Sequence, residues 1–188
     1  MHRRRALLGL AASALLLPMT SQAQDEKSAG RSELDQLVSD TLRDLYRLQP
    51  GARRRIARAA GYAVFSNFGM RLFLLGGGSG EGMAIDRRSG RRTAMKMMEI
   101  QAGLGLGVKK FRLIWVFDKR ADFNAFVDSG WELGGQASAV AKTGDSGGAI
   151  EGAISVKPGV WLYQLTDDGL SLELAVKGSK YYKDDSLN

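Results

Sequence analysis

Residues 61–86 read GYAVFSNFGMRLFLLGGGSGEGMAID, and this stretch decides the fold. Before Gly61 apolar residues recur every three or four positions, whereas after it they follow a period of two and glycines punctuate the chain. Tyr62–Ser66 and Arg71–Leu75 are therefore predicted strands. The glycine-rich run 76–82 lacks the spacing of a nucleotide-binding loop, and no Gly-Lys-Ser/Thr occurs in the chain. We interpret the run as a bent or bulged stretch of sheet.

The same pattern of short strands and tight turns continues to the end of the chain. Met83–Asp86 and Thr93–Met98 flank residues 87–92, whose composition is typical of a hairpin tip. Asp167-Asp168-Gly169 predicts a second tight turn. Because few connections could hold a crossover helix, we expect a mostly antiparallel sheet. The other predicted strands are 101–108, 111–117, 131–141, 150–156, 160–165 and 170–176.

Three segments carry a helical pattern. Apolar residues along 33–48 recur at spacings of three and four, which predicts an amphipathic helix with Ser32 as its N-cap. Its polar face is acidic, so we expect it to pack on the domain's own sheet. Residues 51–60 predict a short basic helix, and 119–129 a helix with aromatic residues on one face. The sequence thus predicts a single α+β domain with two or three helices and a strongly bent sheet or half-barrel.

The first 23 residues have the features of a signal peptide. Three arginines at 3–5 precede an apolar run, 6–17, that is too short to span a bilayer, and a small-x-small cleavage signature ends at Ala23. We predict cleavage after Ala23, by the general or the twin-arginine route. A flexible polar tail, 24–32, and a folded domain, 33–188, are predicted to follow. The protein is therefore expected to be exported and to be periplasmic or peripheral to a membrane.

Composition narrows the possible chemistry. The 188-residue chain has no Cys, and its single His, His2, would leave with the signal peptide. The processed chain would then lack Ser-His-Asp and Cys-His catalytic sites, disulfides, and zinc, haem or iron–sulfur sites built on those residues. Its glutamates are scattered singly, so no pair of acids is indicated for hydrolysis. We expect a non-enzymatic protein with no metal and no cofactor.

Charge is distributed unevenly along the chain. Residues 47–112 contain 14 basic and 3 acidic side chains, a net charge of 14 − 3 = +11. The flanking segments 24–46 and 113–188 carry net charges of 3 − 6 = −3 and 7 − 11 = −4. A segment this basic predicts an anionic partner. Because export is predicted, we expect an anionic phospholipid membrane surface and no nucleic acid.

The candidate lipid-binding residues are basic side chains in three clusters, one on the predicted short helix and two at predicted turns. The plainer interpretation is that these residues only keep the protein soluble. Cations near an anionic membrane contribute on the order of 1 kcal/mol each, so several together would bind it reversibly. The candidates are Arg53, Arg54, Arg55 and Arg58, followed by Arg87, Arg88, Arg91, Arg92, Lys109 and Lys110.

Two groups of large apolar residues are interpreted as core. The methionines between residues 83 and 98 could line an adaptable cavity for an acyl chain, but they fit core packing better. The tryptophans are assigned to the core as well. The residues concerned are Met83, Met95, Met97, Met98, Trp115, Trp131 and Trp161.

From about residue 59 onward the order of these features resembles the SYLF domain, a lipid-binding family shared by bacterial exported proteins and a yeast actin-patch regulator. Each matching stretch is weak alone, but together they cover some 130 residues in the family's order. They are 59–65 (opening strand), 76–82 (glycine-rich loop), 89–90 (turn), 101–107 (glycine-alternating strand), 123–126 (short helix), 169–174 (closing strand) and 181–182 (tail).

The resemblance implies a non-enzymatic domain that binds anionic phospholipids or phosphoinositide-type headgroups. This agrees with the basic segment found independently of it. One alternative stays open, namely an envelope structural or adaptor protein whose basic patch binds an acidic protein partner. Salt would weaken both kinds of binding, so only a dependence on lipid composition separates the two hypotheses.

Overall fold

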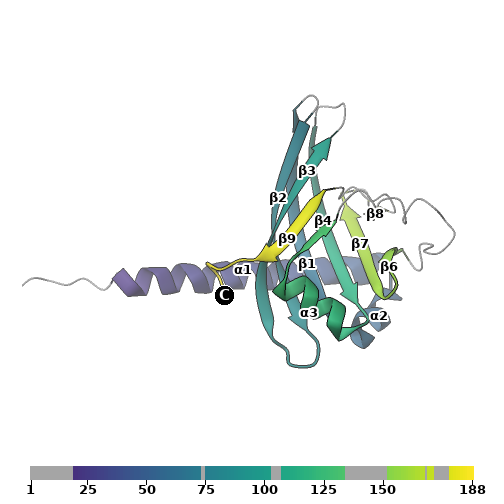
Figure 1. Ribbon diagram of the computed structural model, residues 1–188, viewed down its shortest axis with the longest axis horizontal. Helices are drawn as coiled ribbons and strands as arrows, with labels where there is room; N and C mark the ends of the chain where they lie inside the picture. Colours follow the sequence, from purple (N-terminus) through teal and green to yellow (C-terminus); the bar gives the residue numbers. More distant parts are fainter. Residues whose placement is uncertain (1–18, 73–74, 103–106, 134–151, 168, 172–177) are drawn as a thin grey trace, which may run out of the picture.

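One curled antiparallel sheet with three helices makes up the computed structural model, which describes residues 19–72, 75–102, 107–133, 152–167, 169–171 and 178–188 (Figure 1). The described helices are α1 (Met19–Leu48), α2 (Ala52–Arg58) and α3 (Arg120–Asp128). The described strands are β1 (Gly61–Leu72), β2 (Leu75–Asp86), β3 (Arg92–Ala102), β4 (Gly107–Phe117), β5 (Trp131–Leu133), β6 (Ile154–Lys157), β7 (Val160–Thr166), β8 (Gly169–Ser171) and β9 (Ser179–Lys183).

The strand order across the sheet is β5-β9-β3-β2-β1-β4-β7-β6, and β8 pairs with β7. Every pairing between described strands is antiparallel. The sheet curls into a half-barrel, so the predicted α+β class, the antiparallel pairing and the strong bending are confirmed.

The glycine-rich run is a regular part of the sheet. β1 and β2 pair without interruption from Gly61 opposite Asp86 to Leu72 opposite Leu75, so the two strands predicted within 62–75 belong largely to one long strand, β1. The interpretation of 76–82 as sheet is confirmed, but the pairing contains no bulge there. A Cβ atom on Gly82 of β2 would lie 2.3 Å from the Phe65 ring of β1. Only a glycine at this position leaves room for the Phe65 side chain to lie over β2.

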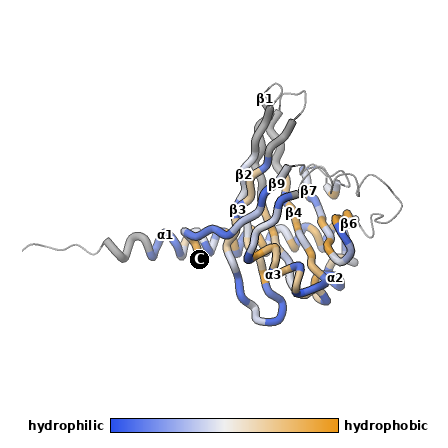
Figure 2. Tube along the Cα trace, viewed as in Figure 1, coloured by the Kyte–Doolittle hydropathy of each residue, from blue (hydrophilic) through white to orange (hydrophobic). Residues whose placement is uncertain are grey.

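Each face of the sheet has its own apolar core. On one face α3 packs Phe123, Phe126 and Val127 against an aromatic cluster that includes Trp115 and Tyr181. On the other face α1 and α2 cover a second core (Figures 1 and 2). The second core includes Leu34, Val38 and Leu45 of α1, Ile56 of α2, and Tyr62, Val64, Met83 and Ile114 of the sheet. The predictions for α3 and for α1 packing on its own sheet are both confirmed.

The structure corrects several boundaries. Residues 24–32 were predicted to be a flexible tail, but they are part of α1, which begins at Met19, so Ser32 is not an N-cap. Near Gly30 this part of α1 meets Leu187, and the Arg31 guanidinium donates a 2.9 Å hydrogen bond to the Leu187 carbonyl. The tail is therefore ordered by contacts with the far end of the chain.

Other predictions fall at the edges of the described residues. Of the predicted strand 101–108, the first two residues end β3, the last two begin β4, and residues 103–106 lie outside the described residues. Strand β9, which pairs with both β3 and β5, was not predicted at all. Residues 1–18 and 134–151 lie outside the description, so cleavage of a signal peptide and most of the predicted strand 131–141 stay predictions.

Candidate functional site

Helix α2 holds the first cluster of candidate arginines. Ala52 and Ile56, four residues apart, are buried against the sheet and fix the rotation of the helix. Arg53, Arg54 and Arg58 are exposed as a consequence. Their direction away from the core follows from the helical period alone.

Aromatic rings hold two of these arginines in place. The Arg53 Cζ atom lies 4.5 Å from the centroid of the Tyr46 ring, and the Arg55 Cζ atom lies 4.2 Å from the Trp161 ring. Such cation–π contacts hold a guanidinium in position without neutralising its charge. Trp161 was predicted to be core, but it is only partly buried and serves as the platform for Arg55.

The β2–β3 turn holds the second cluster, and its conformation is stabilised by Gly90 and by the Asp86 carboxylate. Gly90 has a φ of +72°, and the Asp86 carboxylate accepts the N–H groups of Arg88 (2.8 Å) and Ser89 (3.2 Å). The same carboxylate receives both terminal nitrogens of Arg120, each at 2.8 Å. Burial raises the pKa of Asp86, but the Ser89 and Arg88 N–H groups and the Arg120 cation lower it more, so the net pKa is below its ordinary value.

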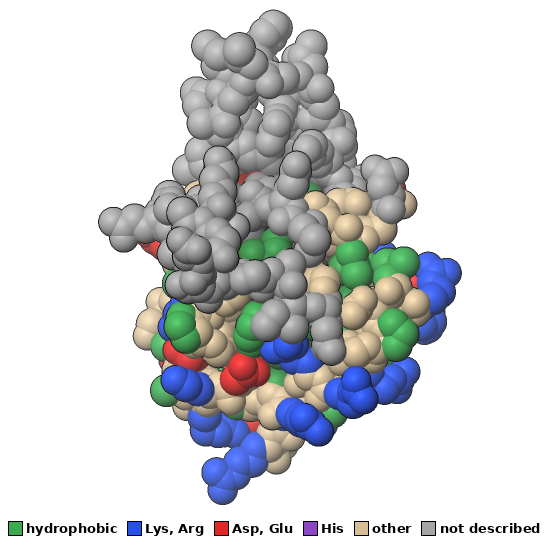
Figure 3. Space-filling model, turned by 90° about the vertical axis from the view of Figure 1, so that its right-hand side faces the viewer, with side chains coloured by type: hydrophobic (Ala, Val, Ile, Leu, Met, Phe, Trp, Pro, Cys, Tyr) green, Lys and Arg blue, Asp and Glu red, His purple; other side chains and the backbone are tan. Residues whose placement is uncertain are grey.

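The two arginine clusters adjoin one another. The Arg87 N–H donates a 3.2 Å hydrogen bond to the carbonyl of Ala60, two residues beyond α2. Burial raises the pKa of Tyr46, while the Arg53 and Arg87 cations both act against this rise, so both clusters lie near the same phenol. Figure 3 shows Lys and Arg side chains spread over the lower part of the face on the α2 side, with few acidic residues among them. The predicted hairpin and helix thus form one basic surface.

Most arginines of this surface have no ion-pair partner among the described residues. Seven guanidiniums form no salt bridge within that part of the chain. They belong to Arg53, Arg54, Arg55, Arg58, Arg87, Arg88 and Arg91. Arg92 differs, because its guanidinium pairs with the Asp35 carboxylate of α1. We use the name arginine surface for these seven unpaired residues.

The structure separates the third predicted cluster from the other two. Lys109 and Lys110 lie near the start of β4, whereas the arginine surface lies beyond its end at Phe117. Lys110 and Phe117 are seven positions apart, which is about 23 Å of strand at ~3.3 Å per residue. These lysines therefore cannot belong to the same contact patch.

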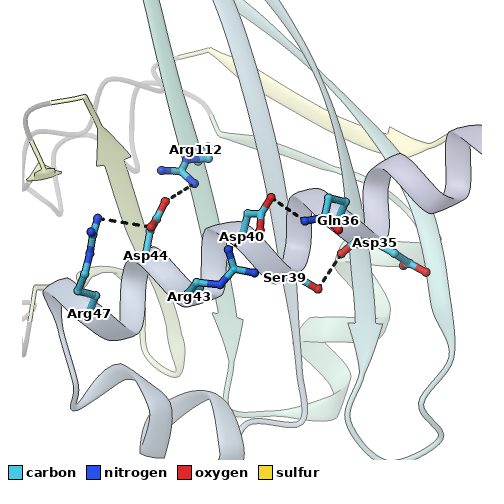
Figure 4. A network of polar contacts seen from close by, with 8 residues as sticks. All are labelled: Asp35, Gln36, Ser39, Asp40, Arg43, Asp44, Arg47 and Arg112. Atoms are coloured by element: carbon cyan, nitrogen blue, oxygen red, sulfur yellow. Dashed lines mark hydrogen bonds and ion pairs between the residues drawn. The ribbon is translucent and has the colours of Figure 1, made fainter.

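The charges of helix α1 are arranged in the opposite way. Its C-terminal half is lined by short polar contacts, shown in Figure 4. Asp40 pairs with Arg43 at 2.8 Å, and Asp44 pairs with Arg112 of β4 at 2.9 Å and with Arg47 at 3.4 Å. The hydrogen bond from the Gln36 amide lowers the pKa of Asp40, and Arg43 adds to this effect. The acidic face of α1 is therefore neutralised within the molecule.

A groove of about 670 Å³ lies between α1 and the sheet. Its lining includes Leu34, Leu37, Gly80 and Met98, and the Met98 side chain is 53% exposed. Met83, Met95 and Met97 are buried, so the prediction of core packing holds for three of the four methionines. The groove residue Glu81 is five residues, about 17 Å of strand, from the hairpin end of β2. The groove is thus separate from the arginine surface.

The glutamates, predicted to stand singly, are only partly dispersed, because Glu33 and Glu81 line the same groove. Glu99 is buried, Glu132 pairs with Lys180 at 3.0 Å, and Glu81 is exposed in the groove, which Glu33 also lines. Within the described residues, no group of three or more His, Cys, Asp or Glu side chains is placed to hold a metal ion. No helix in that part of the chain combines the length and apolar character needed to cross a membrane.

Sequence reasoning missed two residues beside the arginines. Asp118, directly after β4, accepts a 2.9 Å hydrogen bond from the Trp161 indole, and Tyr46 of α1 lies under Arg53. Neither residue has a sequence signal, because each meets its arginine only through the packing of α1, α2 and β7 on the sheet.

The fold is an α+β half-barrel, and its α2 and β2–β3 turn carry seven arginines that form no ion pair within the described residues. The chain is similar to a protein named Beta cell expansion factor A from Aeromonas veronii, with 32% identity over 159 residues. The match takes in 84% of this chain but 58% of that protein, so this chain spans little more than half the length of the relative. No model of a known protein family matches the chain.

Proposed function

We propose that this chain is a SYLF-domain protein of the cell envelope that binds anionic phospholipid or phosphoinositide-type headgroups without catalysis. We further propose that it is exported, loses residues 1–23, and works at a membrane surface. The binding residues would be the arginine surface.

The observation that carries the proposal is the set of neighbouring arginines that find no ion-pair partner in the described part of the chain. Like charges held close together repel one another and do not stabilise the fold. Seven such residues on α2 and one adjacent turn form a surface that an anionic membrane would neutralise. The ordered motifs that resemble the SYLF family support the family assignment.

Co-sedimentation with vesicles tests the proposal directly. The purified protein is mixed with vesicles of neutral phospholipid or with vesicles that contain anionic phospholipid, at low and at moderate salt. We expect binding to anionic vesicles alone, and weaker binding as salt screens the contacts. Absence of binding to either kind of vesicle would contradict the proposal and favour an acidic protein partner, to be sought in envelope extracts.

A matched pair of variants locates the binding surface. Each double variant removes two positive charges. Arg53→Gln/Arg54→Gln removes them from α2, near the end of β4, and Lys109→Gln/Lys110→Gln removes them from the start of β4. At about 1 kcal/mol per cation, the arginine variant should bind anionic vesicles roughly thirtyfold more weakly, and the lysine variant should change little. Equal losses would show that net charge alone governs binding and would argue against the arginine surface.

A further inference from the structure

A hollow of about 440 Å³ lies within the arginine surface, between α2 and the residue that follows β4. Its lining comprises Gly51, Arg54, Arg55, Arg58 and Asp118. The volume falls within the range of about 300–1,000 Å³ found for pockets that bind small molecules. The α2 part of the surface is therefore concave, whereas the arginines of the β2–β3 turn stand on a loop.

The wall of the hollow is held rigid before any ligand arrives. The Arg55 guanidinium stacks on the Trp161 ring, and the Trp161 indole N–H is fixed by the Asp118 carboxylate at 2.9 Å. The Asp118 N–H in turn donates a 2.9 Å hydrogen bond to the carbonyl of Gly159. A chain of contacts from β7 to the end of β4 thus holds the Arg55 guanidinium in place.

The hollow also has an excess of positive charge. Three arginines and one aspartate give the lining a formal charge of 3 − 1 = +2.

We propose that this hollow binds one phosphate monoester group, carried by a lipid headgroup or by a small soluble molecule. A monoester carries a charge close to −2 at neutral pH and offers three acceptor oxygens, which matches the charge of the lining and the forked donors of arginine. A phosphodiester, with a single negative charge, matches the hollow less well. The inference deepens the proposed function, and its membrane form rests on that function.

Binding of soluble esters tests the hollow without any membrane. The full chain is titrated by calorimetry with glycerol 3-phosphate, a monoester, and with glycerophosphoglycerol, a diester. We expect the monoester to bind at least about tenfold more tightly, because a dianion makes stronger charge-assisted contacts with arginine. Equal affinities, or no binding of the monoester, would overturn the proposal.

Two double variants distinguish binding in the hollow from attraction by the positive charge of the whole arginine surface. Arg54→Gln/Arg58→Gln removes two charges from the lining, and Arg87→Gln/Arg88→Gln removes two charges from the neighbouring turn. The first should weaken glycerol 3-phosphate binding by about tenfold or more, and the second by about twofold or less. Equal losses would mean a diffuse field and would refute a discrete site.

Two single variants test individual residues of the lining, and the first is expected to give a gain of affinity that damage to the fold would not mimic. Asp118→Asn removes the one negative charge of the lining and keeps an acceptor for Trp161, so monoester binding should tighten by about threefold or more. Arg55→Lys keeps the charge but lacks the planar fork, so binding should weaken. Unchanged binding in both variants would remove Arg55 and Asp118 from the site and contradict the proposal.

The vesicle experiment separates failure of this inference from failure of the proposed function. Vesicles that contain phosphatidic acid, a monoester, are compared with phosphatidylglycerol vesicles adjusted to the same surface potential. A preference for phosphatidic acid supports the inference in its membrane form. Equal binding to both vesicles would refute that form and leave anionic lipid binding intact. Binding of glycerol 3-phosphate without binding to any vesicle would support the hollow and refute the membrane function.

Discussion

Helices α1 and α2 follow one another in the chain but use their charges in opposite ways. The carboxylates of Asp35, Asp40 and Asp44 on α1 each pair with an arginine, from the same helix or from the sheet. The arginines of α2 and of the adjoining β2–β3 turn have no such partners among the described residues. α1 is thereby neutralised and fastened to the sheet, whereas α2 presents its charge to solvent.

The difference teaches which charges belong to the fold and which are free for a partner. Exposed ion pairs contribute at most about 1 kcal/mol each, so the pairs of α1 matter mainly for where the helix lies. The arginines of the arginine surface form no such pair within the described residues. Four changes to the chain test this division, in order of decreasing expected effect.

The largest effect is expected from the β2–β3 turn. Replacing Arg87, Arg88 and Arg91 by Ser should weaken binding to anionic vesicles by about a hundredfold, at ~1 kcal/mol per cation. Thermal stability should not fall, because the turn is held by backbone N–H groups and the Asp86 carboxylate. Arg92→Ser is the contrasting variant, since it breaks the pair with Asp35 and should affect stability more than binding. Vesicle co-sedimentation and thermal unfolding of both variants decide the matter, and unchanged binding in the triple variant would sink the assignment of the turn.

A smaller effect is expected when a carboxylate is placed beside the arginines of α2, as carboxylates already lie beside arginines on α1. Ala57 is exposed and lies four residues after Arg53 and three after Arg54, so Ala57→Glu places a carboxylate beside both. Vesicle binding should fall by about tenfold, because one cation is paired and one negative charge is added. Ala57→Gln is the control of matched shape. If the Glu and Gln variants bind equally well, the unpaired state of the α2 arginines is irrelevant to binding.

The reverse change on α1 should have a smaller and opposite effect. Asp44→Asn frees Arg47 and Arg112, so vesicle binding should strengthen by about threefold. The free energy of unfolding should fall by about 1 kcal/mol or less. Asp25→Asn, which removes the same charge from an exposed site on α1, is the control. A loss of binding in the Asp44 variant would break the comparison between the two helices.

The smallest effect concerns stability in acid. The folded pKa of Asp86 is lowered, so its ionised form contributes stability above the unfolded pKa of about 4, and this contribution is lost as pH falls through the folded pKa. Asp86→Asn should therefore be less stable than the unmodified chain at neutral pH, by about 1 kcal/mol or less, and equally stable at strongly acidic pH. Urea unfolding across this range measures the difference, with Asp167→Asn as an exposed control. A difference that does not shrink toward low pH would rule out the carboxylate as its source.

Much of the fold could be predicted because its signals are local. The change of period at Gly61, the turn at 87–92 and the buried face of α3 each lie within a dozen residues of sequence. Strand β9 gave no such signal, because Ser179–Lys183 is short and mostly polar and its partner β3 lies some 80 residues earlier in the chain. Residues 24–32 likewise make a contact with Leu187, which lies more than 150 positions later in the chain.

In the candidate site, too, some features follow from the local sequence and others from contacts between distant residues. The sequence by itself determined that α2 and the β2–β3 turn carry dense positive charge, since composition and helical period require nothing further. Only the tertiary structure decided which of these charges are free. Arg92 meets Asp35 across 57 positions of chain, whereas Lys109 and Lys110 are carried to the far end of β4. An ion pair forms over a few ångströms of space, and the distance between two side chains is set by how the sheet and helices pack, not by their order in the chain.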